Sequence, residues 1–242
     1  MNNITLFNFE EMETRDYLQQ NSLNYDFVII GTGFAAYVIA KKLNKAKKIL
    51  LIEKGNLNNE LDSFHFIENL GKIKLKSNTF DEIIGGTSNS WSGNLCEYDD
   101  REFVNNLNNK CEWQIKKDIL NYYPEAWEML RVFFRKNQKA YTFKHDFKFR
   151  KIITQHFPTR ISKLLNKLKV DIIFNAKVDR IGEKTRSFLV INNKNYYFQK
   201  IILANGGIGS IKIIKQSVDN NLLKLNFSKD IIGKFYMNHP KF

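Results

Sequence analysis

The chain contains few cysteines and prolines, and it has no long apolar run. Its 242 residues include two cysteines, Cys96 and Cys111, without C-x-x-C spacing. A disulfide is compatible with this pattern but not implied by it, and reduced thiols in a cytoplasmic protein are the simpler interpretation. No apolar run approaches the about 20 residues that span a bilayer. Residues 1–20 carry four acidic side chains and lack a basic start followed by an apolar core, which argues against a secretory signal.

Histidine is also scarce. The chain has four, and His65, His145 and His156 lack the spaced partners of a metal or nucleophilic site. Surface or hydrogen-bonded structural roles are therefore predicted for these three, and no metal site is predicted.

Acidic residues are outnumbered by basic ones, which gives a formal net charge of +13. In residues 141–151, aromatic side chains alternate with cations, as in surfaces that stack nucleic-acid bases. An edge strand is the alternative, because Phe143, Phe147 and Phe149 occupy odd positions on one side of an extended chain. The other cations are scattered, so a solvated basic surface is favoured over nucleic-acid binding. Such a surface can still attract anionic substrates.

The clearest signal is a strand, glycine turn, helix, strand and acid in succession. The apolar residues 27–30 lead into Gly31 and Gly33, and a second apolar run, residues 49–52, ends in Glu53. Gly31 supplies a tight turn, and Gly33 lets a pyrophosphate approach the backbone at the positive end of the following helix. Glu53 is placed to accept hydrogen bonds from ribose hydroxyls. The adjoining candidates for the same site are Phe34, Ala35 and Lys54.

Two details refine this dinucleotide site. The third small position is Ala36, where the helix packs against the strand and alanine is tolerated. Glu53 argues against NADP because a carboxylate repels a 2′-phosphate. The unit therefore predicts the ADP-ribose of FAD or NAD and does not separate the two.

Three later segments help to decide between FAD and NAD. Residues 83–94 form a loop rich in glycine, hydroxyl and amide side chains with one tryptophan, which suits close approach to a ligand. Residues 200–210 are predicted to form a buried strand, followed by a glycine turn and a short helix. Residues 232–240 have the sequence I-G-K-F-Y-M-N-H-P. In order and spacing, these segments and the first glycine turn resemble the N-terminal half of the glucose–methanol–choline (GMC) family of flavoprotein oxidoreductases, across residues 25–240.

The resemblance implies an FAD site and assigns roles by position. Gly31, Gly33 and Glu53 would hold the ADP-ribose. The residues expected beside the flavin are Gly86, Thr87, Ser88, Trp91, Gly93 and Asn94. The residues expected near the adenosine or pyrophosphate are Val178, through backbone atoms, and Ala204, Gly206 and Gly207. Ser90 stands where some members attach FAD covalently through histidine, so noncovalent FAD is expected.

The implied reaction is hydride transfer from the CH–OH group of a small-molecule alcohol or sugar to flavin N5. In this family the catalytic histidine lies well beyond the position of Phe242, and His239 is not the base, so the catalytic residue stays unassigned. A separately encoded C-terminal half is one expectation. A non-catalytic or degenerate flavin-binding protein is the alternative, and a flavoenzyme of another class that shares the FAD-binding fold is a further one.

The predicted fold is α/β: an FAD/NAD(P)-binding Rossmann-like domain with a central parallel sheet, helices, a β-hairpin and a mostly helical insertion. Residues 1–24 are expected to be an N-terminal extension, and residues 25–95 the first half of the FAD-binding domain. Residues 96–165 are expected to be the helical insertion on the substrate side, with Pro124 in the first turn of a helix. Residues 166–242 complete the FAD-binding domain, with a hairpin over residues 188–198 turning at asparagines.

Overall fold

The computed structural model describes residues 4–57, 81–98, 103, 116–130, 140–145, 148–154 and 158–234. The chain divides into two compact units. One consists of Met1–Ser90 with Arg160–Phe242, and the other is Trp91–Thr159.

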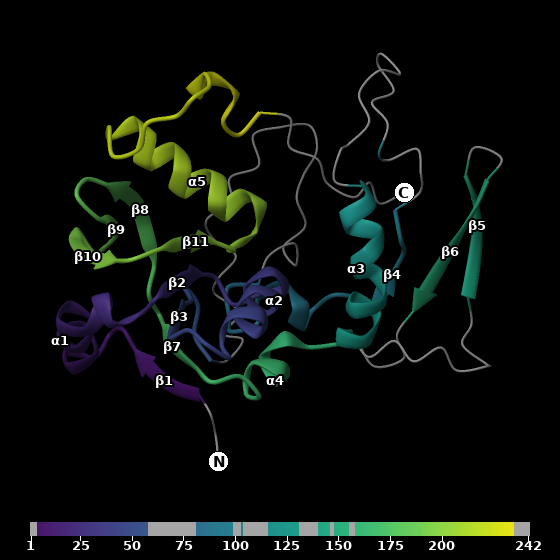
Figure 1. Cartoon of the computed structure of the whole chain (residues 1–242), viewed down its shortest axis with the longest axis horizontal. Coiled ribbons are helices and arrows are strands. Elements are labelled where there is room, and N and C mark those ends of the chain that lie inside the picture. The colour runs from purple at the N-terminus through teal and green to yellow at the C-terminus, as the bar shows by residue number, and fades with distance from the viewer. Residues whose placement is uncertain are drawn as a thin grey trace. The chain divides into compact units, whose positions relative to one another are not determined.

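A five-stranded parallel sheet forms the centre of the first unit (Figure 1). In spatial order its strands are β1 (Ile4–Asn8), β7 (Val170–Phe174), β3 (Ile49–Ile52), β2 (Phe27–Ile30) and β11 (Ile201–Leu203). The interior strands are short and mostly apolar, and Val, Ile and Leu predominate in them because both faces of a parallel sheet are covered. This sheet with its helices confirms the predicted Rossmann-like α/β fold.

A helix follows each of the two glycine turns, one after β2 and one after β11. Helix α2 (Phe34–Leu43) starts after the turn 31–33 that follows β2, and it packs against β2, β3 and α4 (Ile161–Leu165). Helix α5 (Gly206–Asp219) follows β11 and packs on β8. With fourteen residues, α5 is longer than the short helix predicted there. Strand β11 is half-buried rather than buried as predicted, because it is the last strand of the sheet.

A second, antiparallel sheet contributes to the same core. It consists of β8 (Val178–Glu183), β9 (Ser187–Ile191) and β10 (Lys194–Phe198) in the order β10-β9-β8. The turn between β9 and β10 places Asn192 and Asn193 at φ values of 49° and 61°, which confirms the predicted asparagine hairpin. Aromatic residues of β10 lie in one hydrophobic cluster with residues of β2, β3 and β7.

The N-terminal residues are part of this unit. Strand β1 pairs with β7, and α1 (Met12–Asn21) and the short helix η1 (Ser22–Asn24) lead into β2. Leu18 of α1 is fully buried in the core cluster. Residues 4–24 therefore complete the sheet and cover the core, a role that the expectation of an N-terminal extension did not include.

The second unit contains helix α3 (Lys116–Met129) and a three-stranded antiparallel sheet. The sheet order is β4 (Asn94–Leu95), β6 (Lys148–Thr154) and β5 (Ala140–His145). The described residues of the predicted insertion, 96–165, thus include the paired strands β5 and β6 besides helices α3 and α4, and the bounds of the insertion stay a prediction. The stretch of alternating aromatic and basic residues forms two paired strands, with Phe143 opposite Arg150, rather than one edge strand.

Pro124 is also placed differently from the prediction. Helix α3 begins at Lys116, so Pro124 lies in its interior instead of its first turn. The helix continues through the proline, although a proline has no amide hydrogen to donate to the carbonyl of Leu120. In the part of the chain that the structure describes, no helix is both long and apolar enough to cross a membrane.

Candidate functional site

The first glycine turn is shaped by its neighbours within the protein. Gly31 follows β2 with φ at 100°, and its amide donates to the carbonyl of Ile52 at 2.7 Å. A Cβ at this position would lie 2.6 Å from the carbonyl oxygen of Ala204. Gly31 is therefore required by its backbone conformation and by the close approach of the turn between β11 and α5.

Gly33 differs from Gly31, because nothing in the described chain requires a glycine there. It precedes α2 in an extended conformation that any residue can adopt. A Cβ at Gly33 would have a single neighbour within 4 Å, the carbonyl oxygen of Gly85 at 4.0 Å. Gly33 is the N-cap residue of α2 and has no side chain that could cap the helix. This open backbone next to the positive end of a helix suits a phosphate ligand.

The turn after β11 also has open glycine backbone at the start of a helix. A Cβ on either Gly206 or Gly207 would have no neighbour within 4 Å, and no side chain caps α5. Because β2 and β11 are adjacent and parallel, their following turns lie at the same edge of the sheet. The structure thus brings the predicted residues of the two turns together. Ala36 is fully buried in α2, as its packing role requires, and Ala35 is exposed.

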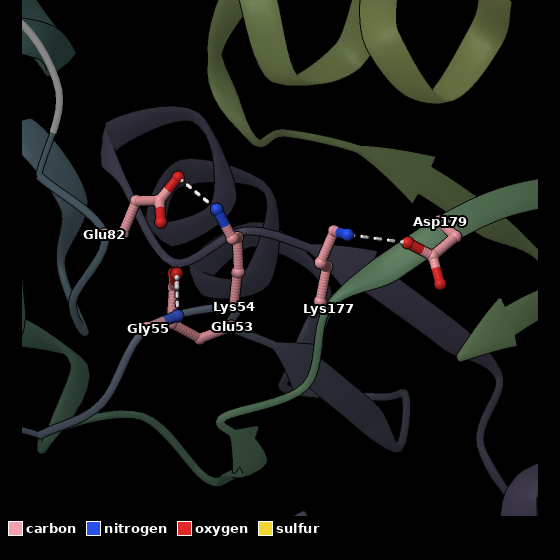
Figure 2. Close-up of polar contacts among 6 residues, drawn as sticks. All are labelled: Glu53, Lys54, Gly55, Glu82, Lys177 and Asp179. Atoms are coloured by element: carbon pink, nitrogen blue, oxygen red, sulfur yellow. Dashed lines mark hydrogen bonds and ion pairs between the residues drawn. The ribbon is translucent and has the colours of Figure 1, made fainter. Parts of the chain in front are cut away.

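Glu53 lies at the end of β3 and is held by the protein itself. Its side chain is 7% exposed, and one carboxyl oxygen accepts from the Thr32 hydroxyl at 2.5 Å. The other accepts from the amide of Gly55 at 3.1 Å (Figure 2). A carboxylate has about four acceptor positions. The backbone amide of Lys54 is a further donor to it, so a ribose hydroxyl would use the remaining acceptor capacity.

Burial in this position raises the pKa of the Glu53 carboxyl above its ordinary value of 4.5. The hydrogen bonds from Thr32, Gly55 and Lys54 oppose this shift, and the charge of Glu82 adds to it. The folded protein therefore favours the protonated acid more than the unfolded chain does.

This shift predicts how Glu53→Gln changes the pH dependence of stability. With a folded-state pKa above the unfolded value, protonated Glu53 stabilises the fold below about pH 4.5, and this contribution is lost as the pH rises through the folded-state pKa. Glutamine is neutral at every pH and retains an oxygen for Gly55 and an amide group for Thr32. The wild type should therefore lose stability relative to Glu53→Gln between about pH 4.5 and neutrality. Urea unfolding of ligand-free protein at several pH values measures this, and parallel curves would contradict it.

The second glycine loop lies beside the first. The short helix η4 (Gly86–Asn89) follows Gly85, whose amide donates to the Thr32 hydroxyl oxygen at 2.9 Å. A Cβ on Gly86 would lie 3.7 Å from the Cα of Gly33. Two predicted glycines from distant parts of the sequence are thus adjacent. Thr87 and Ser90 of this loop are exposed.

Ser88 is buried and takes part in holding the loop. Its hydroxyl donates to the carbonyl of Gly85 at 2.7 Å and accepts from the amide of Ile161 at 2.9 Å. Arg160 donates to the Ser88 carbonyl at 3.0 Å. These contacts attach the loop to the start of α4. The Ser88 side chain therefore positions the loop, and a contact with flavin stays a prediction.

The remaining predicted residues near the first turn have defined surroundings. Lys54 forms an ion pair with Glu82, which lies just before the second loop (Figure 2). Val178 begins β8 and its side chain belongs to the core cluster, so only its backbone is suited to contact a ligand, and that contact stays a prediction. Its neighbours Lys177 and Asp179 pair at 3.1 Å.

Three residues predicted beside the flavin belong to the other unit. Trp91 donates through its indole nitrogen to the carbonyl of Thr159 at 2.8 Å. Gly93 is buried with φ at 77°, and Asn94 begins β4. Their part in a cofactor site stays a prediction.

Other residues singled out in the sequence lie outside the described part of the chain: His65, Cys111, His156 and the segment 235–240 with His239. Cys96 is exposed and not disulfide-bonded. Among the described residues, no group of three His, Cys, Asp or Glu side chains could hold a metal.

Sequence reasoning missed Thr32 and Gly85. Thr32 occupies the variable position between the two glycines of the first turn, where sequence carries no signal for a role. Its importance depends on contacts with residues 21 and 53 positions away.

No family model and no curated protein matches the chain. Among solved structures it is similar to a fungal aryl-alcohol oxidase, at 13% identity and a TM-score of 0.46, over 79% of this chain and 47% of that one. It is also similar to THI4 from Thermovibrio ammonificans, at 13% identity and a TM-score of 0.46, over 88% and 67% of the two chains. A third similar structure is pyridoxine 4-oxidase from Mesorbium loti, at 13% identity and a TM-score of 0.45, over 78% of this chain and 50% of that one. The chain spans about half the length of the two oxidases.

Proposed function

We propose that this chain binds FAD noncovalently and belongs to an oxidoreductase that acts on the CH–OH group of an alcohol or sugar. The observation that carries the proposal is the pair of open glycine turns after the adjacent strands β2 and β11, with Glu53 at the end of the next strand. Gly33 and Gly207 are glycines that the fold itself does not need. Their lack of side chains is explained if a ligand approaches the backbone there.

The residues fit the ADP-ribose part of such a cofactor. The N-termini of α2 and α5, whose N-cap residues form no side-chain cap hydrogen bond, favour a pyrophosphate. The remaining acceptor capacity of Glu53 suits a ribose hydroxyl. The loop that starts at Gly85 is the candidate for contacts farther along the cofactor. Bound FAD would supply the chemistry by accepting a hydride at flavin N5. The substrate class rests on the family resemblance, and the proposed cytoplasmic location rests on the two cysteines and the acidic N-terminal residues.

FAD binding is tested directly on the purified chain. We expect yellow protein that releases intact FAD on denaturation, because noncovalent cofactor is freed when the fold is lost. Gly33→Ala should weaken FAD binding by about tenfold to a hundredfold, since a methyl group would take the place of a close phosphate contact. Titration of apoprotein with FAD, followed by flavin absorbance and fluorescence, measures this.

A matched control is Ala46→Val, which adds two methyl groups to an exposed residue beyond the end of α2. It should leave FAD affinity unchanged. A folded wild-type chain that takes up no FAD would contradict the proposal. A chain that binds FAD but oxidises no alcohol or sugar, alone or with a candidate C-terminal half, would favour the non-catalytic alternative.

A further inference from the structure

Thr32 connects two parts of the candidate site that are far apart in sequence. Its hydroxyl oxygen accepts from the amide of Gly85 at 2.9 Å and lies 2.5 Å from a carboxyl oxygen of Glu53. The residue is 1% exposed, so within this site water does not compete for either contact. One side chain thus touches both the acid after β3 and the start of the second glycine loop.

The directions of these hydrogen bonds follow from the chemistry of the groups. The Gly85 amide can only donate, so the Thr32 oxygen must accept from it. The single Thr32 proton then remains for the carboxyl oxygen of Glu53, which accepts it at 2.5 Å. Serine can reproduce both contacts. Valine and alanine can reproduce neither, and valine has nearly the shape of threonine.

The second loop has few other ties to the first turn. Gly85 is followed by Gly86, which faces Gly33, and the loop is otherwise attached to α4 through Ser88 and Asn89. The Thr32 hydroxyl is therefore the polar link between the β2–α2 turn and the loop in the described structure. A change in the position or charge of Glu53 reaches the loop through this link.

We propose that Thr32 is a positioning residue that couples occupation of the ribose site at Glu53 to the order of the loop 85–90. This inference rests on the proposed function, since it assigns the ribose contact to Glu53. A ligand that fixes Glu53 also fixes the Thr32 proton and thereby strengthens the hydrogen bond from the Gly85 amide. The loop is then held in place before its own part of the ligand is engaged.

The test uses ADP, which carries the ribose and diphosphate but no flavin. Amide hydrogen exchange of residues 84–90 is measured in the wild type, Thr32→Ser and Thr32→Val, with and without saturating ADP. Calorimetric titration of each variant verifies that ADP is bound. Inorganic pyrophosphate serves as the ligand control because it has no ribose.

In the wild type and in Thr32→Ser, ADP should slow exchange at Gly85, and pyrophosphate should have less effect. In Thr32→Val without ligand, the Gly85 amide should exchange about tenfold faster or more, because it is left without its acceptor. In that variant ADP should still bind but should no longer protect the loop. Thr32→Ala replaces Thr32→Val if valine prevents folding.

The outcomes separate the two proposals. A folded wild type that binds neither ADP nor FAD overturns the proposed function and this inference with it. A wild type that binds ADP without slowing exchange at Gly85 overturns the inference alone. Equal protection by ADP in the wild type and in Thr32→Val also overturns the inference alone, because the coupling would then not pass through Thr32.

Discussion

Gly31→Ala should lower the free energy of unfolding by about 3 kcal/mol or more, the sum of a positive φ imposed on a residue with a side chain and of steric overlap in a packed interior. The overlap is with backbone: the new methyl group would lie 2.6 Å from the Ala204 carbonyl oxygen and 2.8 Å from the Asn205 Cα. Neither atom can move aside without displacing the turn between β11 and α5. Urea unfolding followed by far-UV circular dichroism measures the loss.

Gly33→Ala is the matched control, two residues away in the same turn. Its methyl group meets one atom at 4.0 Å in a backbone conformation open to alanine, so the free energy of unfolding should change by less than about 1 kcal/mol. The two glycines of the motif thus separate into one that the fold needs and one that is explained by the proposed ligand. Equal losses of stability in both variants would show that this distinction is wrong.

Gly55→Ala is expected to have the second large effect, a loss of about 3–5 kcal/mol in the free energy of unfolding. A Cβ at Gly55 would fall 1.6 Å from the carbonyl oxygen of Glu82, which is closer than any non-bonded contact allows. The segment that leads into the second glycine loop would have to move away from β3. Gly55 also donates to Glu53 and accepts from the amide of Asn175, so the displacement would disturb the acid.

Gly207→Ala makes the same chemical change with the opposite expected sign. Gly207 lies in α5 with nothing within 4 Å of an added Cβ, so alanine should stabilise the protein by about 0.4–1 kcal/mol through the unfolded state. Circular dichroism is a better probe of Gly55→Ala and Gly207→Ala than tryptophan fluorescence. The three tryptophans lie within residues 91–159, whereas both glycines lie in the other unit.

A stability of Gly55→Ala within 1 kcal/mol of the wild type would refute the steric argument.

The sheet strands and the first glycine turn were predictable because their signals are local. Runs such as residues 27–30 and 170–174 are short and mostly apolar, and each is followed by a turn. Burial on both faces can therefore be predicted from one stretch of sequence. The hairpin over residues 188–198 was predictable for a similar reason, since consecutive asparagines tolerate positive φ.

Other elements carried weaker local signals. Strand β1 is a five-residue edge strand with exposed positions, so it lacks the apolar run of a buried strand. The antiparallel sheet of the second unit depends on pairing between residues 94–95 and 153–154, which no local pattern reveals. Pro124 favoured a helix start, but the helix begins eight residues earlier, because one missing hydrogen bond does not outweigh the other contacts of the segment.

The sequence by itself determined the order of strand, glycine turn, helix and acid, because each of these depends on a few neighbouring residues. Only the tertiary structure decided which glycine the fold requires. It brought Ala204 against Gly31 and left Gly33 open. It also decided the roles of Thr32 and Gly85, which act through hydrogen bonds between residues far apart in the chain. Such contacts depend on strand order and register, and a local pattern of residue types does not contain that information.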